Sequence, residues 1–521
     1  MTTHHYPYFD GENLSQDPIH GYIPFSSATE DGEVSERDIV DSDWVQRLRQ
    51  IHQLQTAWLV YPTAEHTRFQ HSLGAMHLAS KTLAQLYPSL VDVCNEMGET
   101  LPSRAYLESL VRMAALLHDV GHGPFGHFFD ARFLSQYHLN HEKLGAEIIR
   151  QKLAPMLRKI RRNPLGTLAK GETLDPEQIA FLIVRPAKPS KSFGIVGCPH
   201  PSPLPEGEGT MVNPLTEGKG TMVNPLTKRE GTKTTLSEGG GNSTWLRLLR
   251  SLFSGMYTVD NMDFVLRDAY MTGFSARAFD IDRLLHYSFF TRQGLTVHQR
   301  GFATLTRFLS VRAELFRSVY FHRTVRAIDI ALGVLFAESK DLIFPGNPLE
   351  HLDEYLHFTE WSLLVDVARW GESTDAKKRE LAPAWHDFLQ RRVPLHLAAE
   401  TTVIFRAGER EQTSVFAGEE SLRRAIVQHL PESMRSIPFE VDIARHLHRP
   451  DSHRPMASQN FLYDSATDRI RQLEEEELFW HIPQSYRICR IYTQHTEQIA
   501  PLAKAMDALT RAGSEDDETN M

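Results

Sequence analysis

The chain of 521 residues lacks the features that mark secreted, membrane-spanning or zinc-ribbon proteins. It has only three cysteines, Cys94, Cys198 and Cys489. They lie far apart without a C-x-x-C pair, which argues against a disulfide framework and a zinc ribbon. No apolar run approaches the roughly 18 residues that a membrane-spanning helix needs. The first residues, Met1–Tyr6, also lack the pattern of a signal peptide. We therefore expect a cytoplasmic protein without a membrane partner.

The composition has no extreme of charge or hydropathy. The formal net charge is -10, which argues against a dominant nucleic-acid-binding surface, so a nucleic-acid partner is not indicated. Hydrophobic residues make up 41% of the chain and charged residues 23%, values that are ordinary for globular proteins. A chain of this length is expected to form about two to four domains.

Helical periodicity is the main pattern that the sequence does contain. Apolar residues recur at helical spacing in 36–60, 72–87, 106–117, 142–157, 301–317 and 324–338. Strand patterns are sparse before residue 350, and later ones cover 401–405, 439–443 and 486–492. The sequence therefore predicts a mainly α fold, a helical bundle followed by a smaller α+β C-terminal region.

Residues 184–243 interrupt the periodic pattern. They are rich in Gly, Pro and Thr, and Gly-Thr-Met-Val-Asn-Pro-Leu-Thr occurs at 209–216 and again at 220–227. Such a composition cannot build a core, so we expect a disordered surface insert, with a regulatory linker as the alternative. The predicted divisions are an N-terminal arm (1–35), the bundle in two parts (36–183 and 244–349), the insert (184–243), an α+β accessory region (350–512) and an acidic tail (513–521).

A histidine and an aspartate follow directly after an apolar run at 113–117. His118 and Asp119 come directly after this run, which predicts a buried helix that delivers both to its C-terminal end. Gly121 and Pro124 then end the helix, because Pro lacks an amide proton and Gly tolerates unusual dihedral angles. Histidine and aspartate supply nitrogen and oxygen ligands to divalent metals.

Several further segments complete a recognisable order. They are Asp17–Gly21 (DPIHG), Gln46–Leu54 (QRLRQIHQL), His66–Gly74 (HTRFQHSLG), Leu116–His127 (LLHDVGHGPFGH), His141-Glu142, Asp260–Asp268 (DNMDFVLRD) and Tyr320–Arg323 (YFHR). In this order the chain resembles the HD superfamily of metal-dependent phosphohydrolases, and within it the dGTPase-like deoxynucleoside triphosphate triphosphohydrolases. The resemblance spans roughly residues 15 to 345 without the insert. It predicts an HD-domain helical bundle.

The resemblance implies one metal site. Its ligands would be His71, His118, Asp119 and Asp260, which together would hold one divalent ion. Mixed nitrogen and oxygen ligation suits Mn, Fe, Ni or Zn better than Ca, and Mg is also admitted. The alternative is a buried polar network without a metal.

The resemblance also implies an acid–base group around the scissile phosphate. His141 would act in acid/base chemistry beside His122, His127 and Asp130. A nearby aspartate would raise the pKa of a proton-donating histidine into a useful range. For His122 and His127 the alternative is helix capping or a satisfied core position.

The implied substrate contacts depend on single matching residues. They are Arg68, Gln53, Leu54, Asp268, Arg312 and Tyr320, where the tyrosine ring would lie under a deoxyribose and exclude a 2′-hydroxyl. Asn261 and Phe264 depart from the family pattern, in which a Lys and a Tyr are found at these positions. Both departures favour a different nucleotide or phosphoester. For His322 and Arg323 a surface or packing role is the alternative.

The expected reaction is the hydrolysis of a deoxynucleoside triphosphate to deoxynucleoside and triphosphate. The alternatives are a phosphodiesterase or nucleotidase of the wider HD superfamily, and a nucleotide-binding sensor without turnover. The resemblance also implies a homo-oligomer, a dimer or tetramer, with a nucleotide activator between subunits. Its contacts are expected in the N-terminal and C-terminal regions.

Overall fold

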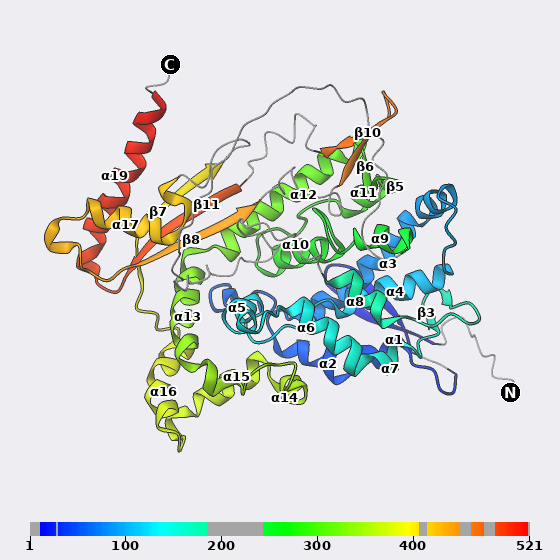
Figure 1. Ribbon diagram of the computed structural model, residues 1–521, viewed down its shortest axis with the longest axis horizontal. Coiled ribbons are helices and arrows are strands. Elements are labelled where there is room, and N and C mark those ends of the chain that lie inside the picture. Colours follow the sequence, from blue (N-terminus) through cyan, green and yellow to red (C-terminus); the bar gives the residue numbers. More distant parts are fainter. Residues whose placement is uncertain are drawn as a thin grey trace, which may run out of the picture.

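The protein is seen in a computed structural model that describes residues 11–27, 30–184, 243–405, 414–447, 460–473 and 485–518. Helices dominate and the sheets are small, which confirms the mainly α fold with a smaller α+β C-terminal region (Figure 1). Among the described helices, none is both long enough and apolar enough to cross a bilayer.

Three helices form the centre of the bundle. The longest, α3 (Arg68–Glu96), packs against α4 (Arg104–Leu117) and α10 (Val259–Met271). Their apolar faces are fully buried, which matches the periodicity predicted at 72–87 and 106–117. The helix α4 ends at Leu117, with His118 as its C-cap, so the expectation that this helix delivers His118 and Asp119 is confirmed.

The segment 36–60 does not form the helix that its spacing predicts. It is divided into α1 (Glu36–Val40), α2 (Asp43–Gln46) and the 3₁₀ turns η2 (Arg47–Gln50) and η3 (Ala57–Leu59). Ser35 caps α1 by accepting a hydrogen bond from the Asp38 amide, and Ser42 occupies the N-cap of α2. Gln55 has a φ of 51°, which no α-helix tolerates. The single helix predicted here is therefore wrong.

The remaining bundle helices surround this centre. They are α5 (His127–Arg132), α6 (His141–Ile148), the π-turn η5 (Ile149–Leu153), α7 (Ala154–Leu157), α8 (Pro176–Ile183), α9 (Thr244–Arg250), α11 (Ile281–His286), α12 (Phe302–Leu315), the π-turn η7 (Phe316–Tyr320) and α13 (Arg323–Ile343). The helix predicted over 142–157 is thus interrupted by the wider π-turn η5.

The C-terminal region contains a sheet between two helical layers (Figure 1). After α14 (Leu352–His357), α15 (Glu360–Ala368) and α16 (Ala376–Leu389), the strands β7 (His396–Phe405), β11 (Ser485–Thr493) and β8 (Glu440–Leu447) form an antiparallel sheet. Cys489 and Ile491 pack with α17 (Glu419–His429) and α19 (Ile499–Glu518), whereas Tyr486 and Ile488 join the bundle core. The three strands predicted from sequence are present. The helix α19 continues into the predicted acidic tail, and residues 519–521 lie outside the described residues.

Three further sheets lie among the described residues, and one of them joins distant parts of the chain. Inside the predicted N-terminal arm, β1 (Glu12–Asp17) and β2 (Gly21–Ser26) form a hairpin. Strands β5 (Ser288–Thr291) and β6 (Gly294–His298) form a four-stranded sheet with β9 (Phe461–Asp464) and β10 (Arg469–Gln472), where β6 and β9 run parallel. A minor hairpin joins β3 (Arg162–Asn163) to β4 (Gly166–Thr167).

The predicted insert can be tested by deletion. Residues 185–242 lie outside the described residues, and the helices on either side, α8 and α9, pack against each other. The Arg250 guanidinium donates a hydrogen bond to the Val184 carbonyl, which attaches the end of α8 to the end of α9. Because the composition cannot build a core, replacing 185–242 with a short Gly/Ser linker should leave the melting temperature and metal content nearly unchanged. Calorimetry and elemental analysis check this, and a large fall in melting temperature would show that the segment packs.

Candidate active site

Three helix ends meet at one group of ligating atoms. His71 lies in the first turn of α3, His118 at the end of α4 and Asp260 in the first turn of α10. The Nε2 of His71 is 3.2 Å from the Nε2 of His118 and 3.2 Å from Oδ1 of Asp260. All three ligating atoms lie within 4.8 Å of one another, so the group can hold a metal ion.

The hydrogen bonds of the two histidines prepare them for a metal. Nδ1 of His71 lies 2.8 Å from Oδ2 of Asp263, and Nδ1 of His118 lies 2.7 Å from the Ala115 carbonyl. Because both partners are acceptors, each Nδ1 carries the proton and each Nε2 presents a lone pair. Two lone pairs facing each other at 3.2 Å repel unless a cation lies between them.

The charges around His71 support the same conclusion. Burial by itself lowers the pKa of His71, yet hydrogen bonds to Asp260 and Asp263 raise it to about 10. The position therefore favours a positive charge strongly, and a divalent metal would supply it in place of a proton. The residues present fit a divalent metal with nitrogen and oxygen ligands.

Asp119 adjoins this group and is also paired with Arg68. Its Oδ1 lies 3.3 Å from Nε2 of His118, whereas its Oδ2 accepts a hydrogen bond from Nη1 of Arg68 at 2.7 Å. Burial by itself raises the pKa of Asp119, but His118 and Arg68 hold it well below the usual range. Asp119 is therefore a carboxylate. Arg68, predicted to reach a nucleotide, here contacts Asp119.

A second layer of polar residues holds His71 in place, and sequence reasoning missed it. Asp263 accepts hydrogen bonds from Nε and Nη2 of Arg267, both at 2.9 Å, and its Oδ1 lies 2.6 Å from Nε2 of His20. Nη1 of Arg267 in turn contacts Asp17, in the β1–β2 hairpin, at 2.7 Å. The i,i+3 spacing of Asp260 and Asp263 was the available signal, because it places both carboxylates on one helix face.

Gly74 explains why this layer can approach α3 so closely. A Cβ atom at this position would lie 1.9 Å from Oδ1 of Asp263 and 2.3 Å from Nη2 of Arg267. Any larger residue would therefore displace the pair that orients His71. Glycine at position 74 therefore leaves the space that Asp263 and Arg267 occupy against α3.

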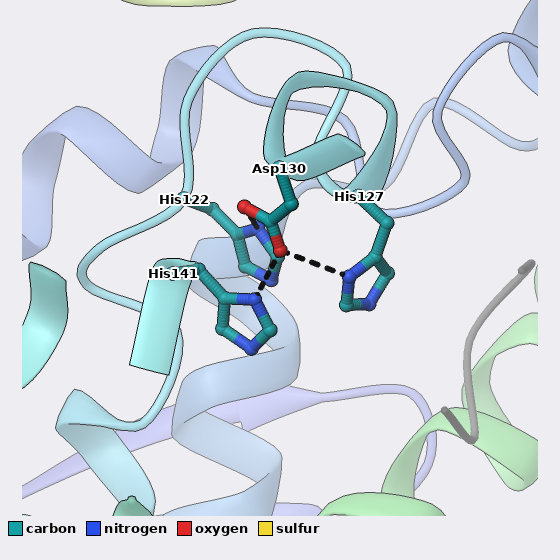
Figure 2. A group of neighbouring side chains, drawn as sticks. All are labelled: His122, His127, Asp130 and His141. Atoms are coloured by element: carbon teal, nitrogen blue, oxygen red, sulfur yellow. Dashed lines mark hydrogen bonds and ion pairs between the residues drawn. The ribbon is translucent and has the colours of Figure 1, made fainter. Parts of the chain in front are cut away.

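A second group of side chains lies next to the first (Figure 2). His122, His127 and His141 surround the carboxylate of Asp130. Nδ1 of His141 is 2.5 Å from Oδ2 of Asp130, and Nδ1 of His127 is 3.3 Å from the same oxygen. Nε2 of His122 lies 3.4 Å from Oδ1 of Asp119, which joins this group to the first. The structure therefore brings together all four residues predicted for acid–base chemistry, although their composition would also suit a metal.

The histidines of this group differ in charge. Burial by itself lowers the pKa of His141, but the adjacent Asp130 carboxylate raises it above the ordinary value. Burial, reinforced by Arg68, lowers the pKa of His122 well below the ordinary range. The two rings stack at 3.8 Å between centroids and 15° between planes. A neutral His122 thus lies against a His141 that tends to be protonated.

The tight turn after Asp119 places these histidines. Phe125 and Gly126 have φ values of 59° and 55°, so the chain reverses just before α5, which begins at His127. A Cβ at Gly121 would lie 2.1 Å from the His141 carbonyl oxygen. Glycine at this position therefore allows the start of α6 to approach the turn.

Three of the six predicted substrate residues, Gln53, Asp268 and Tyr320, lie along one chain of hydrogen bonds. The backbone amide of Gln53 donates to the His66 carbonyl at 3.0 Å, and Nε2 of His66 lies 2.7 Å from Oδ1 of Asp268. The Tyr320 hydroxyl donates to Oδ2 of Asp268 at 2.5 Å. Leu54, beside Gln53, is buried.

The other predicted contacts differ in position. Arg312 is buried and donates a hydrogen bond to the Met256 carbonyl at 3.0 Å. Burial lowers its pKa, and the charges of Asp260 and Tyr320 act in the opposite direction. His322 caps α13 by accepting a hydrogen bond from the Thr324 amide. Phe264 is buried 6.5 Å from the Tyr320 ring centroid.

Comparison with known proteins identifies the domain that carries these residues. The family model described as HD domain matches residues 68–180, which include His71, His118 and Asp119 but not Asp260. Deoxynucleoside triphosphate triphosphohydrolase SAMHD1 of Bos taurus is 38% identical over 128 residues, 24% of this chain and 19% of that protein. The uncharacterized protein YwfO of Bacillus subtilis is 24% identical over 384 residues, 70% of this chain and 68% of that protein.

The fold extends further than the domain match. A crystal structure of a hypothetical protein from Aquifex aeolicus has a TM-score of 0.60 and 19% identity, with 95% of this chain and all of that chain covered. At this identity the likeness concerns the fold alone. The chain therefore contains an HD domain. Over that region it is homologous to the SAMHD1 triphosphohydrolases, of which it spans less than a fifth in the bovine protein.

Proposed function

We propose that the protein is a metal-dependent phosphohydrolase that converts deoxynucleoside triphosphates to deoxynucleoside and triphosphate. The observation that carries this proposal is the meeting of His71, His118 and Asp260 beside the His141–Asp130 pair. This arrangement supports a metal and a proton donor that act side by side. Homology to SAMHD1 over the HD region supports a nucleotide as the substrate.

His71, His118, Asp119 and Asp260 would hold one divalent ion. When bound, such an ion polarises a phosphoryl group and lowers the pKa of water. The second layer, from Asp263 to Arg267, keeps His71 in the tautomer that presents Nε2 to the ion. The ion would be Mn, Fe, Ni, Zn or Mg.

His141 would supply the proton that the reaction needs. Water adds to the α-phosphorus, the bond to the 5′-oxygen breaks, and the departing alkoxide is a poor leaving group. Protonated His141 donates to this oxygen, while Asp130 stabilises the imidazolium at 2.5 Å. The neutral ring of His122 stacked on His141 adds no positive charge that would oppose protonation.

The residues on the nucleoside side support a deoxyribose. Burial raises the pKa of Tyr320 well above its usual value, so its hydroxyl stays protonated and donates to Asp268. We assign Tyr320 and Asp268 to the sugar, Gln53 and Leu54 to the sugar and base, and Arg68 and Arg312 to the phosphates. Guanidinium geometry suits phosphate oxygens.

Product analysis tests this function directly. Metal-reconstituted protein is incubated with each dNTP and NTP, and the products are separated by ion chromatography. Release of tripolyphosphate supports the proposal. The departures at Asn261 and Phe264 favour the second candidate, a phosphodiesterase or nucleotidase, which would release monophosphate or orthophosphate instead. Binding without any product would identify a sensor. Assembly into a dimer or tetramer stays a prediction that light scattering with and without dNTP would check.

The pH dependence of turnover should report His141. The donor must be protonated, and its pKa is raised above the ordinary value, so kcat should stay high through neutral pH and fall as the pH rises through that pKa. Asp130→Asn removes the carboxylate, and burial then dominates. The alkaline limb of the kcat profile should move to lower pH by roughly one to three units, the usual effect of a close opposite charge. Profiles of both proteins at equal metal content check this, and an unmoved limb would assign it to another group.

A further inference from the structure

The loop that carries Gln53 and Leu54 is attached to the start of α3. The backbone amide of Gln53 donates to the His66 carbonyl at 3.0 Å, and the backbone amide of Arg68 donates to the Ile51 carbonyl at 3.0 Å. These two hydrogen bonds attach the loop to the helix end that carries Arg68 and His71. Gln53 is only 4% exposed, yet neither Nε2 nor Oε1 of its side chain has a hydrogen-bond partner among the described residues. A buried amide without partners is costly, which indicates a polar ligand.

A buried carboxylate holds the loop on the N-terminal side of Gln53. Glu360, at the start of α15, accepts from the His52 amide at 3.3 Å. Its Oε1 also lies 2.8 Å from Nδ1 of His52 and 3.0 Å from Nε1 of Trp58. The side chain of Glu360 is fully buried, so these bonds are shielded from water.

A second buried carboxylate holds the loop on the C-terminal side. Oδ1 of Asp329, in α13, accepts from Oγ1 of Thr56 at 2.5 Å and from Nε2 of Gln55 at 3.0 Å. Gln55 has a φ of 51°, a conformation that costs a non-glycine residue free energy. The bond from its side chain to Asp329 offsets that cost.

Asp329 is in turn connected to the C-terminal sheet. Nη1 of Arg326 lies 3.7 Å from Oδ2 of Asp329. Arg326 also donates to Asp442 of β8, from Nη2 at 2.5 Å and from Nε at 3.1 Å. Arg326 and Asp442 are both buried, so the sheet fixes the cation beside Asp329.

We propose that Asp329 is a positioning residue for substrate recognition. It holds Gln55 and Thr56, so that the buried side-chain amide of Gln53 is in place for a polar group of the nucleoside. Asp442 and Arg326 hold Asp329 in turn, so the C-terminal region contributes to recognition although it touches no substrate. This inference depends on the proposed function for its substrate. The attachment of the loop to Asp329 is independent of that function.

The first test is the kinetics of Asp329→Ala. Losing the anchor of the loop should raise KM for the hydrolysed nucleotide roughly tenfold, whereas kcat and metal content should stay within about twofold. Asp329→Asn retains an oxygen that accepts from Thr56 and Gln55, so it should restore KM. Asp341→Ala, an exposed position on the same helix, is the matched control. A fall in kcat with KM unchanged would overturn the proposal.

A double mutant separates positioning from general stability. If Asp329 acts through Gln53, the Gln53→Ala/Asp329→Ala protein should have the same KM as Gln53→Ala alone. Multiplicative increases would overturn the proposal. Thr56→Val, which removes one bond from the loop side, provides a second variant if Asp329→Ala folds poorly. Thr56→Val should also raise KM.

Hydrogen exchange distinguishes failure of this inference from failure of the proposed function. The amides of residues 53–57 should exchange at least tenfold faster in Asp329→Ala than in wild type, whatever the substrate. Unchanged exchange overturns the inference even if dNTPs are hydrolysed. If no nucleotide is hydrolysed, the proposed function fails, and KM is then measured on the phosphoester that the substrate panel identifies. If Gln53→Ala leaves that KM unaltered, the role of the loop in recognition is disproved.

Discussion

Asp119→Ala is expected to lose the bound metal and the hydrolytic activity together. The substitution removes a carboxylate 3.3 Å from Nε2 of His118 and leaves the metal with one anionic ligand fewer. It also leaves Arg68 buried without its partner at 2.7 Å. Breaking a buried ion pair from one side typically costs about 3–5 kcal/mol, so a lower melting temperature should accompany the loss.

Two variants control for that instability. Asp119→Asn retains the size of the side chain and an oxygen for Arg68, so it should fold better but still bind metal weakly. Asp92→Ala, at an exposed position of α3, should leave metal content and melting temperature unchanged. Metal is measured by elemental analysis after reconstitution. One equivalent of metal in purified Asp119→Ala would disprove its role as a ligand.

Local patterns in the sequence predicted the parts of the site that depend on single helices. The apolar run before His118 is continuous, as expected of a buried helix, so the end of α4 could be placed correctly. The fragmentation of 36–60 was missed because apolar spacing dominated the prediction. The serines before α1 and α2 and the left-handed Gln55 interrupt the helix there.

Contacts between distant segments could not be predicted in this way. His20 and Asp263 are 243 positions apart, and Thr56 and Asp329 are 273 apart, yet each pair is hydrogen-bonded. The parallel pairing of β6 with β9 likewise joins segments that nothing local connects. Hydrogen bonds of this kind are set by how the helices pack, and periodicity along one helix does not determine that packing.

The two groups of side chains proposed for metal binding and for acid–base chemistry differ in what their side chains can do. In the first group both histidines give their Nδ1 protons to fixed acceptors and present lone pairs to each other. In the second group His141 and His127 both face one oxygen of Asp130 through Nδ1. Asp130 is thereby used as the partner of the histidines, which supports an acid–base role for that group.

His141→Ala is therefore expected to retain its metal and its nucleotide binding while turnover collapses. His141 begins α6, where the helix dipole disfavours the charged imidazole, but Asp130 at 2.5 Å offsets this and raises the pKa of His141. Removing a general acid usually lowers the rate by about 10²–10⁴-fold. Single-turnover kinetics, equilibrium nucleotide binding and elemental analysis measure the three quantities separately, with exposed His357→Ala as the matched control. Turnover within a few-fold of wild type would reduce His141 to a helix-start residue. The proton donor would then be His127 or His122, and the lowered pKa of His122 makes it the weaker candidate for that role.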